Sequence, residues 1–239
     1  MTENLTPALA TQPECIVFTD WDGTVTLQDS NDALTDNLGY GEERRKFLNQ
    51  EVLHGRWTFR DAFHDMLESV DIPFPECITY LKQHVKLDPG FRTFYEWARE
   101  NNIPVIIVSS GMHPIIHALL ESLVGADAAA EIQIVSNNVN IDEATGRWTI
   151  VYRDDTDFGH DKSLAIKPYA EKSPRPTLFY CGDGVSDLSA ARETDLLFAK
   201  EGRDLITFCE REKIPYVTFG NFGDIQQGIQ EYMKKNKTE

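Results

Sequence analysis

The sequence predicts an α/β fold with a doubly wound parallel sheet. Short runs of apolar and β-branched residues alternate with longer segments that have the apolar periodicity of amphipathic helices. Such alternation is typical of βαβ units, in which helices cover both faces of a parallel sheet. A second observation is that residues 27–88 contain no convincing strand pattern. We therefore expect a helical insertion behind the first strand.

The elements are expected in a regular order along the chain. Prolines separate two helices of the insertion, another proline starts a later helix, and an Asn-Asn pair ends one. Expected helices cover 30–38, 41–53, 57–70, 74–85, 91–101, 114–123, 162–170, 185–192, 205–212 and 225–233. Expected strands cover 15–18, 103–108, 131–135, 178–181, 196–199 and 216–219, with a hairpin over 138–152.

The first expected strand ends in two carboxylates, Asp20 and Asp22, which Gly23 follows at once. Residues two positions apart in an extended chain point to the same side. Two acids at the end of a buried strand are costly unless a positive group meets them, and hard oxygen ligands suit Mg²⁺. The alternative is a strand followed by an ordinary polar turn, in which Asp and Gly are common.

Two later strands end in the same manner. The strand at 178–181 runs into Asp183 and Asp187, and the strand at 103–108 runs into Ser109 and Ser110. Open parallel α/β sheets bind ligands beyond the carboxyl ends of their strands. We therefore expect these strand ends to meet at one site.

Together these strand ends resemble the haloacid dehalogenase (HAD) superfamily of phosphatases, most closely its phosphoserine-phosphatase-like branch. The resemblance extends from about Cys15 to the region after Asp187. It implies a Rossmann-like core with a parallel sheet and a small inserted α-helical cap of the C1 type. The expected boundaries are a loose segment at 1–14, a core at 15–26 and 89–239, and a cap at 27–88.

The resemblance also implies roles for the acids. Asp20 is expected to attack phosphorus and form an aspartyl-phosphate, while Asp22 serves as general acid and base. The nearby charge of Asp20 should raise the pKa of Asp22. Mg²⁺ is expected on the carboxylates of Asp20 and Asp183 and the backbone carbonyl of Asp22. Asp187 completes the metal set, either directly or through water.

A phosphoryl group needs donors besides the metal. The family places a Ser or Thr at the position of Ser109, and the backbone amides of Ser110 and Gly111 near a helix start are further expected donors. The family also needs a lysine before the last acidic strand. Lys162, which opens a helix, is favoured over Lys167.

Two positions in the expected cap bear on the substrate. Aligned with the phosphoserine-specific members, Asp29 falls on their acid and Met66 falls on their basic residue. Because methionine cannot donate to a carboxylate, we expect Asp29 to accept hydrogen bonds from hydroxyls of the substrate. The alternative for Asp29 is a turn or helix cap. The chain is also similar to fungal proteins of this branch associated with sugar-alcohol phosphates, so a polyol phosphate is the expected substrate.

Other functions stay open beside this one. The substrate could instead be a sugar phosphate, phosphoserine or a nucleotide, and the chain could be a non-catalytic metabolite-binding protein. A dehalogenase, a phosphonatase and a phosphomutase are ranked lower, since Asp22 and the Gly-Asp-Gly-x-x-Asp run at 182–187 favour phosphate hydrolysis and a metal.

The composition of the chain limits the classes of molecule that it is expected to bind. The net charge of −16 argues against nucleic acid and anionic membranes, because no basic stripe exists to replace counterions. The four cysteines are scattered and form no C-x-x-C pair, which fits a reducing, cytoplasmic setting. The start of the chain has no apolar run typical of a secretory signal. We expect a small phosphorylated metabolite as partner and leave the oligomeric state open, with a monomer favoured.

Overall fold

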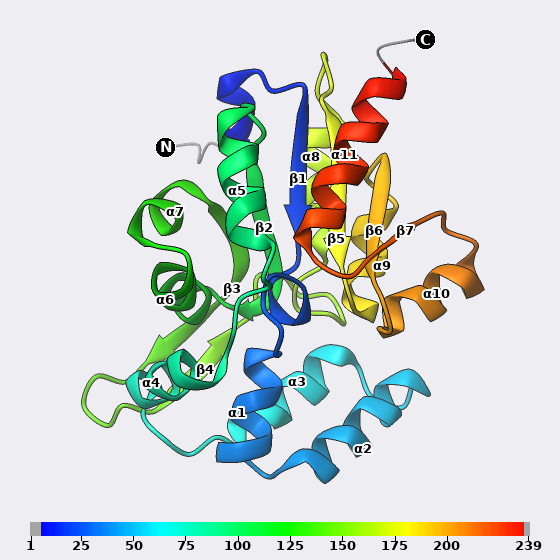
Figure 1. Cartoon of the computed structure of the whole chain (residues 1–239). Coiled ribbons are helices and arrows are strands. Elements are labelled where there is room, and N and C mark those ends of the chain that lie inside the picture. The colour runs from blue at the N-terminus through cyan, green and yellow to red at the C-terminus, as the bar shows by residue number, and fades with distance from the viewer. Residues whose placement is uncertain (1–5, 237–239) are drawn as a thin grey trace. The chain divides into compact units, whose positions relative to one another are not determined.

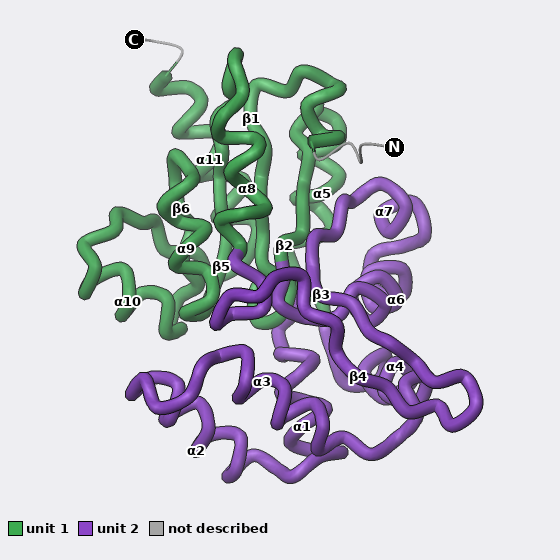
Figure 2. The backbone as a smooth tube through the Cα atoms, turned by 180° about the vertical axis from the view of Figure 1, so that it is seen from behind, with its two compact units in different colours: residues 1–25, 87–108, 162–239 green, residues 26–86, 109–161 purple. Residues whose placement is uncertain are grey.

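The computed structural model describes residues 6–236 and divides the chain into two compact units (Figures 1 and 2). Unit 1 contains the chain up to Val25, residues 87–108 and the chain from Lys162 onward. Unit 2 contains residues 26–86 and 109–161. The two units therefore alternate along the chain, and β2 (Val105–Met112) passes from one to the other.

The strands form a seven-stranded sheet in the order β4-β3-β2-β1-β5-β6-β7. The strands that pair within unit 1 all run parallel. The residues in the middle of these strands are mainly apolar. β1 is buried along its whole length, as is expected of a parallel strand that is covered on both faces. This mostly parallel sheet confirms the expected α/β class. The further strands of unit 1 are β1 (Cys15–Thr19), β5 (Thr177–Gly182), β6 (Leu196–Lys200) and β7 (Val217–Phe219).

Helices cover both faces of the unit 1 strands. In Figure 1, α5 (Phe91–Glu100) and α11 (Phe222–Asn236) lie in front of the strands, and α8 (Lys162–Ala170) lies behind them. The ring of Phe222 packs 4.9 Å from that of Phe91 and 5.0 Å from that of Phe94, which joins α11 to α5. The remaining elements of unit 1 are α9 (Leu188–Ala191), α10 (Asp204–Glu212), the 3-10 helices η1 (Pro7–Thr11) and η3 (Val185–Asp187), and the π-helical turn η2 (Trp21–Val25).

Unit 2 combines helices with the antiparallel pair β3 (Gln133–Ile141) and β4 (Trp148–Val151). Side chains cap two of its helices, since Asp29 accepts from amides of α1 and Thr58 accepts from the amide of Asp61 in α3. Trp148 packs its ring 5.4 Å from Phe74 and so joins β4 to α4. The helices are α1 (Ser30–Leu38), α2 (Glu42–Leu53), α3 (Phe59–Glu68), α4 (Phe74–His84), α6 (His113–Leu123) and α7 (Ala126–Glu131).

Most expected elements exist, although several differ in their bounds. The helix expected at 185–192 is divided into the 3-10 helix η3 and α9. β3 is one continuous strand, whereas two were expected, and α7 takes the place of the start of the first. The segment at 27–88 is helical, but its compact unit also includes 109–161, so its role as a cap stays a prediction. Of the N-terminal segment expected to be loose, residues 7–11 form η1, and residues 1–5 lie outside the described part. Within residues 6–236, no helix has the length and apolar character needed to cross a membrane.

A buried carboxylate fixes the point where the chain re-enters unit 1. The amide of Asp88 donates to the carbonyl of Val25, 2.8 Å away, so the departing and returning chains are joined. Oδ1 of Asp88 accepts from the amides of Gly90 at 2.9 Å and Phe222 at 3.1 Å. Oδ2 accepts from Nζ of Lys200 at 3.0 Å. Asp88 thereby ties the chain crossing to β6 and to the start of α11.

This clamp predicts the cost of a nearly isosteric change. Asp88→Asn keeps an oxygen for the two amides but turns an amide nitrogen toward the Lys200 ammonium, which is then left without its carboxylate. We expect a loss of about 3 kcal/mol in the free energy of unfolding, measured by urea denaturation. Glu42→Gln, which breaks an exposed pair with Lys46, should cost less than about 0.5 kcal/mol.

A second variant separates the stranded charge from a general packing defect. Adding Lys200→Met to Asp88→Asn removes the unpaired ammonium and should recover part of the loss. Equal stability of Asp88→Asn and wild type would contradict the stabilising role of the contacts that Asp88 makes with Lys200 and the two amides.

Candidate active site

Asp20 lies directly after β1 and is held from three directions within unit 1. Its amide donates to the carbonyl of Cys181 on the neighbouring strand at 2.8 Å. Its Oδ1 accepts from the amide of Trp21 at 2.7 Å and from Nζ of Lys162 at 2.9 Å. Only 6% of Asp20 is exposed, so its carboxylate is fixed at the end of the strand.

The turn after Asp20 allows the carboxylate of Asp183 to approach Gly23 closely. Gly23 has φ +74°, in the left-handed region that favours glycine. A Cβ at this position would overlap the carboxylate of Asp183. Asp22, one residue earlier, is extended and 7% exposed. The glycine is therefore required both by the backbone and by the close approach of Asp183.

Three carboxylates form a cluster in unit 1. Oxygen atoms of Asp20, Asp183 and Asp187 all lie within 4.8 Å of one another. Lys162 contacts two of these acids, and the half-exposed Arg203 reaches to 3.9 Å from Asp183. Negative charge thus exceeds the buried positive charge of Lys162. A cluster of hard oxygen donors with a negative excess fits Mg²⁺. The side chain of Asp22 is not part of the cluster.

Asp187 is held by four donors, two on each oxygen. Its Oδ1 accepts from Nζ of Lys162 and from the hydroxyl of Tyr180, both at 2.6 Å. Its Oδ2 accepts from the amides of Asp183 at 2.9 Å and Gly184 at 3.0 Å. A carboxylate offers about four lone-pair positions. The arrangement therefore favours an Asp187 that fixes Lys162 and the turn over one that binds the ion directly.

Burial and charge shift the protonation of this group. Burial raises the pKa of Asp20 to about 7, the charge of Asp187 adds to the shift, and Lys162 opposes it. Burial disfavours the ammonium of Lys162, but the charges of Asp187 and Asp20 outweigh burial and raise the pKa of the lysine. Burial, with Asp187 and Asp20, raises the pKa of Tyr180 well above its usual range, so its hydroxyl keeps the proton.

The two candidate lysines lie in different surroundings. Lys162 begins α8, is fully buried and pairs with Asp20 and Asp187. Lys167 is exposed and lies 3.9 Å from Glu171 on the surface of the same helix. The geometry favours Lys162 as the lysine of the site, because Lys162 contacts Asp20 and Asp187 whereas Lys167 pairs with Glu171.

The other expected phosphate-binding residues, Ser109, Ser110 and Gly111, lie in unit 2, near the end of β2. Oγ of Ser109 accepts from the amide of Gly111 at 3.0 Å. Nδ1 of His160 donates to the carbonyl of Ser109, and Nδ2 of Asn137 donates to the carbonyl of Ser110, both at 2.8 Å. The hydroxyl of Ser110 is buried without a hydrogen-bond partner among residues 6–236. Two buried side chains that the sequence analysis missed therefore fix this segment.

The strand is longer than expected, since β2 continues to Met112. The amides of Ser110 and Gly111 were expected near a helix start, and α6 begins at His113, two residues after Gly111. The amide of Gly111 is engaged by the side chain of Ser109.

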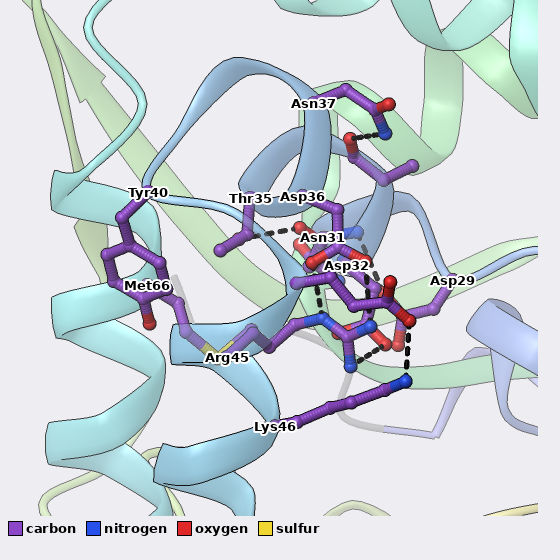
Figure 3. Close-up of polar contacts among 12 residues, drawn as sticks. Asp29, Asn31, Asp32, Thr35, Asp36, Asn37, Tyr40, Arg45, Lys46 and Met66 are labelled. Atoms are coloured by element: carbon purple, nitrogen blue, oxygen red, sulfur yellow. Dashed lines mark hydrogen bonds and ion pairs between the residues drawn. The ribbon is translucent and has the colours of Figure 1, made fainter.

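Asp29 caps helix α1 in unit 2, which is the alternative that the sequence left open. Its Oδ1 accepts from the amides of Asn31 at 2.8 Å and Asp32 at 2.9 Å. Burial raises the pKa of Asp29, while these amides and the charge of Arg45 lower it. Figure 3 shows the guanidinium of Arg45 among acids of α1, bound to Asp32 at 2.8 Å and Asp36 at 2.7 Å. Arg45 thus joins α2 to α1 close to Asp29.

Met66 is the residue that the resemblance aligns with the basic residue of the phosphoserine-specific members. It is on α3 and is 5% exposed. Its side chain therefore adds apolar surface to unit 2 and no charge.

The raised pKa of Asp20 predicts how the metal-free protein responds to pH. Between the unfolded pKa of 3.8 and the folded value of about 7, the folded state binds more protons than the unfolded state. The protonated Asp20 therefore favours the folded state at low pH, and this contribution to stability is lost as the pH rises to about 7. In EDTA, we expect the Tm of wild type to fall more over this range than the Tm of Asp20→Asn, in which the group is absent. Identical slopes by calorimetry would contradict the shift.

Comparisons with known proteins identify the family of the chain. A family model described as haloacid dehalogenase-like hydrolase matches residues 17–192. The chain is 55% identical over 225 residues to Pdp3-interacting factor 1 of Schizosaccharomyces pombe, which covers 93% of this chain and 98% of that protein. It is 51% identical over 233 residues to Polyol phosphate phosphatase PYP1 of Saccharomyces cerevisiae, which covers 94% of this chain and 96% of that protein.

Solved structures show the same fold at low identity. A phospho-aspartyl intermediate analogue of phosphoserine phosphatase matches with a TM-score of 0.66 and 15% identity, over 89% of this chain and 97% of that chain. A HAD family hydrolase of Salmonella enterica matches with a TM-score of 0.69 and 19% identity, over 88% of this chain and 69% of that chain. The expected family is confirmed: the chain belongs to the haloacid dehalogenase-like hydrolases.

Proposed function

We propose that this chain is a Mg²⁺-dependent phosphomonoester hydrolase that acts on sugar-alcohol phosphates. The observation that carries the proposal is the buried arrangement at the end of β1, where Asp20 contacts Lys162 and lies within 4.8 Å of Asp183 and Asp187. In-line phosphoryl transfer uses a nucleophile held beside positive charge, and here Lys162 contacts Asp20 while Asp20 and Asp183 offer oxygens to a metal ion. The relative named polyol phosphate phosphatase supports both the reaction and the substrate class.

The chemical steps follow from the two acids of the first strand end. A carboxylate oxygen of Asp20 forms a bond to phosphorus while the bond from phosphorus to the leaving alcohol oxygen breaks. Asp22 gives its proton to that oxygen, so the alcohol leaves neutral. Asp22 then takes a proton from water, whose oxygen attacks phosphorus and releases Asp20 and inorganic phosphate.

Charge on the transferred phosphoryl group must be offset throughout. Lys162 donates from one side of Asp20, and Ser109 with the backbone of Ser110 and Gly111 donates to the phosphoryl oxygens. Asp20, Asp183 and the carbonyl of Asp22 would hold Mg²⁺, and the bound ion would supply positive charge that favours an ionised nucleophile and lowers the cost of the phosphoryl charge. Asp187 holds Lys162 in place.

The substrate assignment rests on unit 2. Asp29 is a hydrogen-bond acceptor, and Met66 replaces the base that would pair with an amino-acid carboxylate. A polyol offers hydroxyl donors and has no carboxylate to leave unpaired. The occupant we propose is a small pentitol or hexitol phosphate. The four cysteines are buried and free, which supports a reducing compartment such as the cytoplasm.

The first test removes the nucleophile. Asp20→Asn keeps the size of the side chain and should lower kcat for ribitol 5-phosphate by at least about 10⁴-fold, because covalent transfer is lost. Wild-type turnover should stop in EDTA and return with Mg²⁺. The matched control is Asp195→Asn, an acid that pairs with Arg175 and accepts from the amide of Leu178 at the start of β5, the end opposite to Asp183. This variant should keep the wild-type rate. Substantial turnover by Asp20→Asn, or full activity in EDTA, would refute the mechanism.

The second test concerns the substrate. Asn caps a helix as well as Asp, so Asp29→Asn keeps α1 while it removes the charge. We expect kcat/KM for ribitol 5-phosphate and sorbitol 6-phosphate to fall about tenfold, a loss of about 1.4 kcal/mol in transition-state stabilisation, with p-nitrophenyl phosphate little changed. Thr58→Ala, which removes the cap of α3, controls for helix stability. If phosphoserine or a mononucleotide is the best substrate, or if the variant behaves as wild type, the polyol assignment fails.

A further inference from the structure

Tyr180 contacts Asp187 from inside the sheet and is used by no step of the mechanism. We propose that Tyr180 is a positioning residue, whose hydroxyl sets how the Lys162 ammonium is shared between Asp187 and Asp20. The inference rests on the proposed phosphatase activity. It assigns a function to a side chain that otherwise resembles part of the apolar core.

The approach of Tyr180 to Asp187 depends on a missing side chain. Tyr180 and Gly182 are two positions apart on β5 and face the same side of the sheet. A Cβ on Gly182 would overlap the Asp187 carboxylate. The space left by the glycine is therefore filled by Asp187, and the Tyr180 hydroxyl meets its Oδ1 at 2.6 Å.

The four side chains linked by these hydrogen bonds, from Tyr180 through Asp187 and Lys162 to Asp20, are removed from water. Tyr180, Lys162 and Asp187 are fully buried, and Asp20 is 6% exposed. Hydrogen bonds to charged groups are strongest in such surroundings, because solvent neither competes for them nor screens them. A change at Tyr180 is therefore felt at Lys162 and, through it, at Asp20.

The direction of the effect follows from the distances. Lys162 lies 2.6 Å from Asp187 and 2.9 Å from Asp20, so Asp187 already holds it more closely. Tyr180 shares Oδ1 of Asp187 and offsets part of its charge with a neutral donor. Without that hydroxyl, Lys162 alone faces Oδ1 and is drawn further toward Asp187. Less of its positive charge then reaches Asp20 and the phosphoryl group in the transition state.

Tyr180→Phe tests the hydroxyl alone, since the ring remains. We expect kcat for ribitol 5-phosphate to fall about tenfold and KM to change less than about twofold, because the ammonium is withdrawn mainly from the transition state. Tyr152→Phe is the matched control. Its hydroxyl donates to the carbonyl of Arg60 at 2.9 Å within unit 2, so it should lose comparable stability and no activity.

A binding measurement gives a readout that does not depend on turnover. Orthovanadate with Mg²⁺ mimics the transferring phosphoryl group, and calorimetry should show its Kd about tenfold higher in Tyr180→Phe than in wild type. Inorganic phosphate should bind both proteins alike. A purely structural role for Tyr180 would lower Tm and leave both the kcat and the vanadate Kd unchanged, and that result would overturn the proposal.

The outcomes separate this inference from the proposed function. Active wild type with an equally active Tyr180→Phe refutes the role of Tyr180 and leaves the phosphatase intact. Wild type inactive on every phosphomonoester refutes the proposed function. The vanadate titration still decides the role of Tyr180 in that case, since equal Kd values for the two proteins would refute it.

Discussion

Carboxylates buried at the ends of parallel strands need positive charge, and unit 1 is arranged around this need. Lys162 is the buried cation that contacts Asp20 and Asp187, and its own burial is tolerated only because both acids surround it. Burial and the charge of Asp187 raise the pKa of Asp20 despite Lys162, and three carboxylates lie around this one buried lysine. The remaining excess of negative charge is what makes the cluster suited to a divalent cation.

Glycines make this concentration of charge possible. Gly23 and Gly182 lie where a Cβ would overlap the carboxylates of Asp183 and Asp187, respectively. Each glycine therefore admits an acid from another part of the chain to the end of a strand. An alanine at position 182 would displace the Asp187 carboxylate before it disturbed the sheet, because the clash is with that side chain, whereas an alanine at position 23 would also strain a backbone with φ +74°.

The strand ends could be predicted from sequence because their signal is local. An apolar run that stops at Asp20 or Asp183 indicates both the strand and the polar edge. Tyr180 could not be found in this manner, since a tyrosine inside an apolar strand is usually a core residue. His160 and Asn137 were missed because their partners are backbone carbonyls far away in the sequence. Only the fold brings such groups together.

The prediction of secondary structure from the sequence was wrong in detail around residues 126–141. The strand expected at 131–135 is the start of the longer β3, and the alanine-rich α7 precedes it. Asp29 shows a different difficulty, since one residue can both cap a helix and bind a ligand, and sequence alone does not separate these roles.

The central claim is that Asp20 becomes covalently phosphorylated. The most direct measurement is a single turnover with ribitol 5-[³²P]phosphate, quenched in acid and digested for mass spectrometry. The account predicts a phosphorylated peptide that contains Asp20, with the label on that residue and absent from Asp20→Asn. A label on another residue, or hydrolysis with no labelled protein at any quench time, would contradict it.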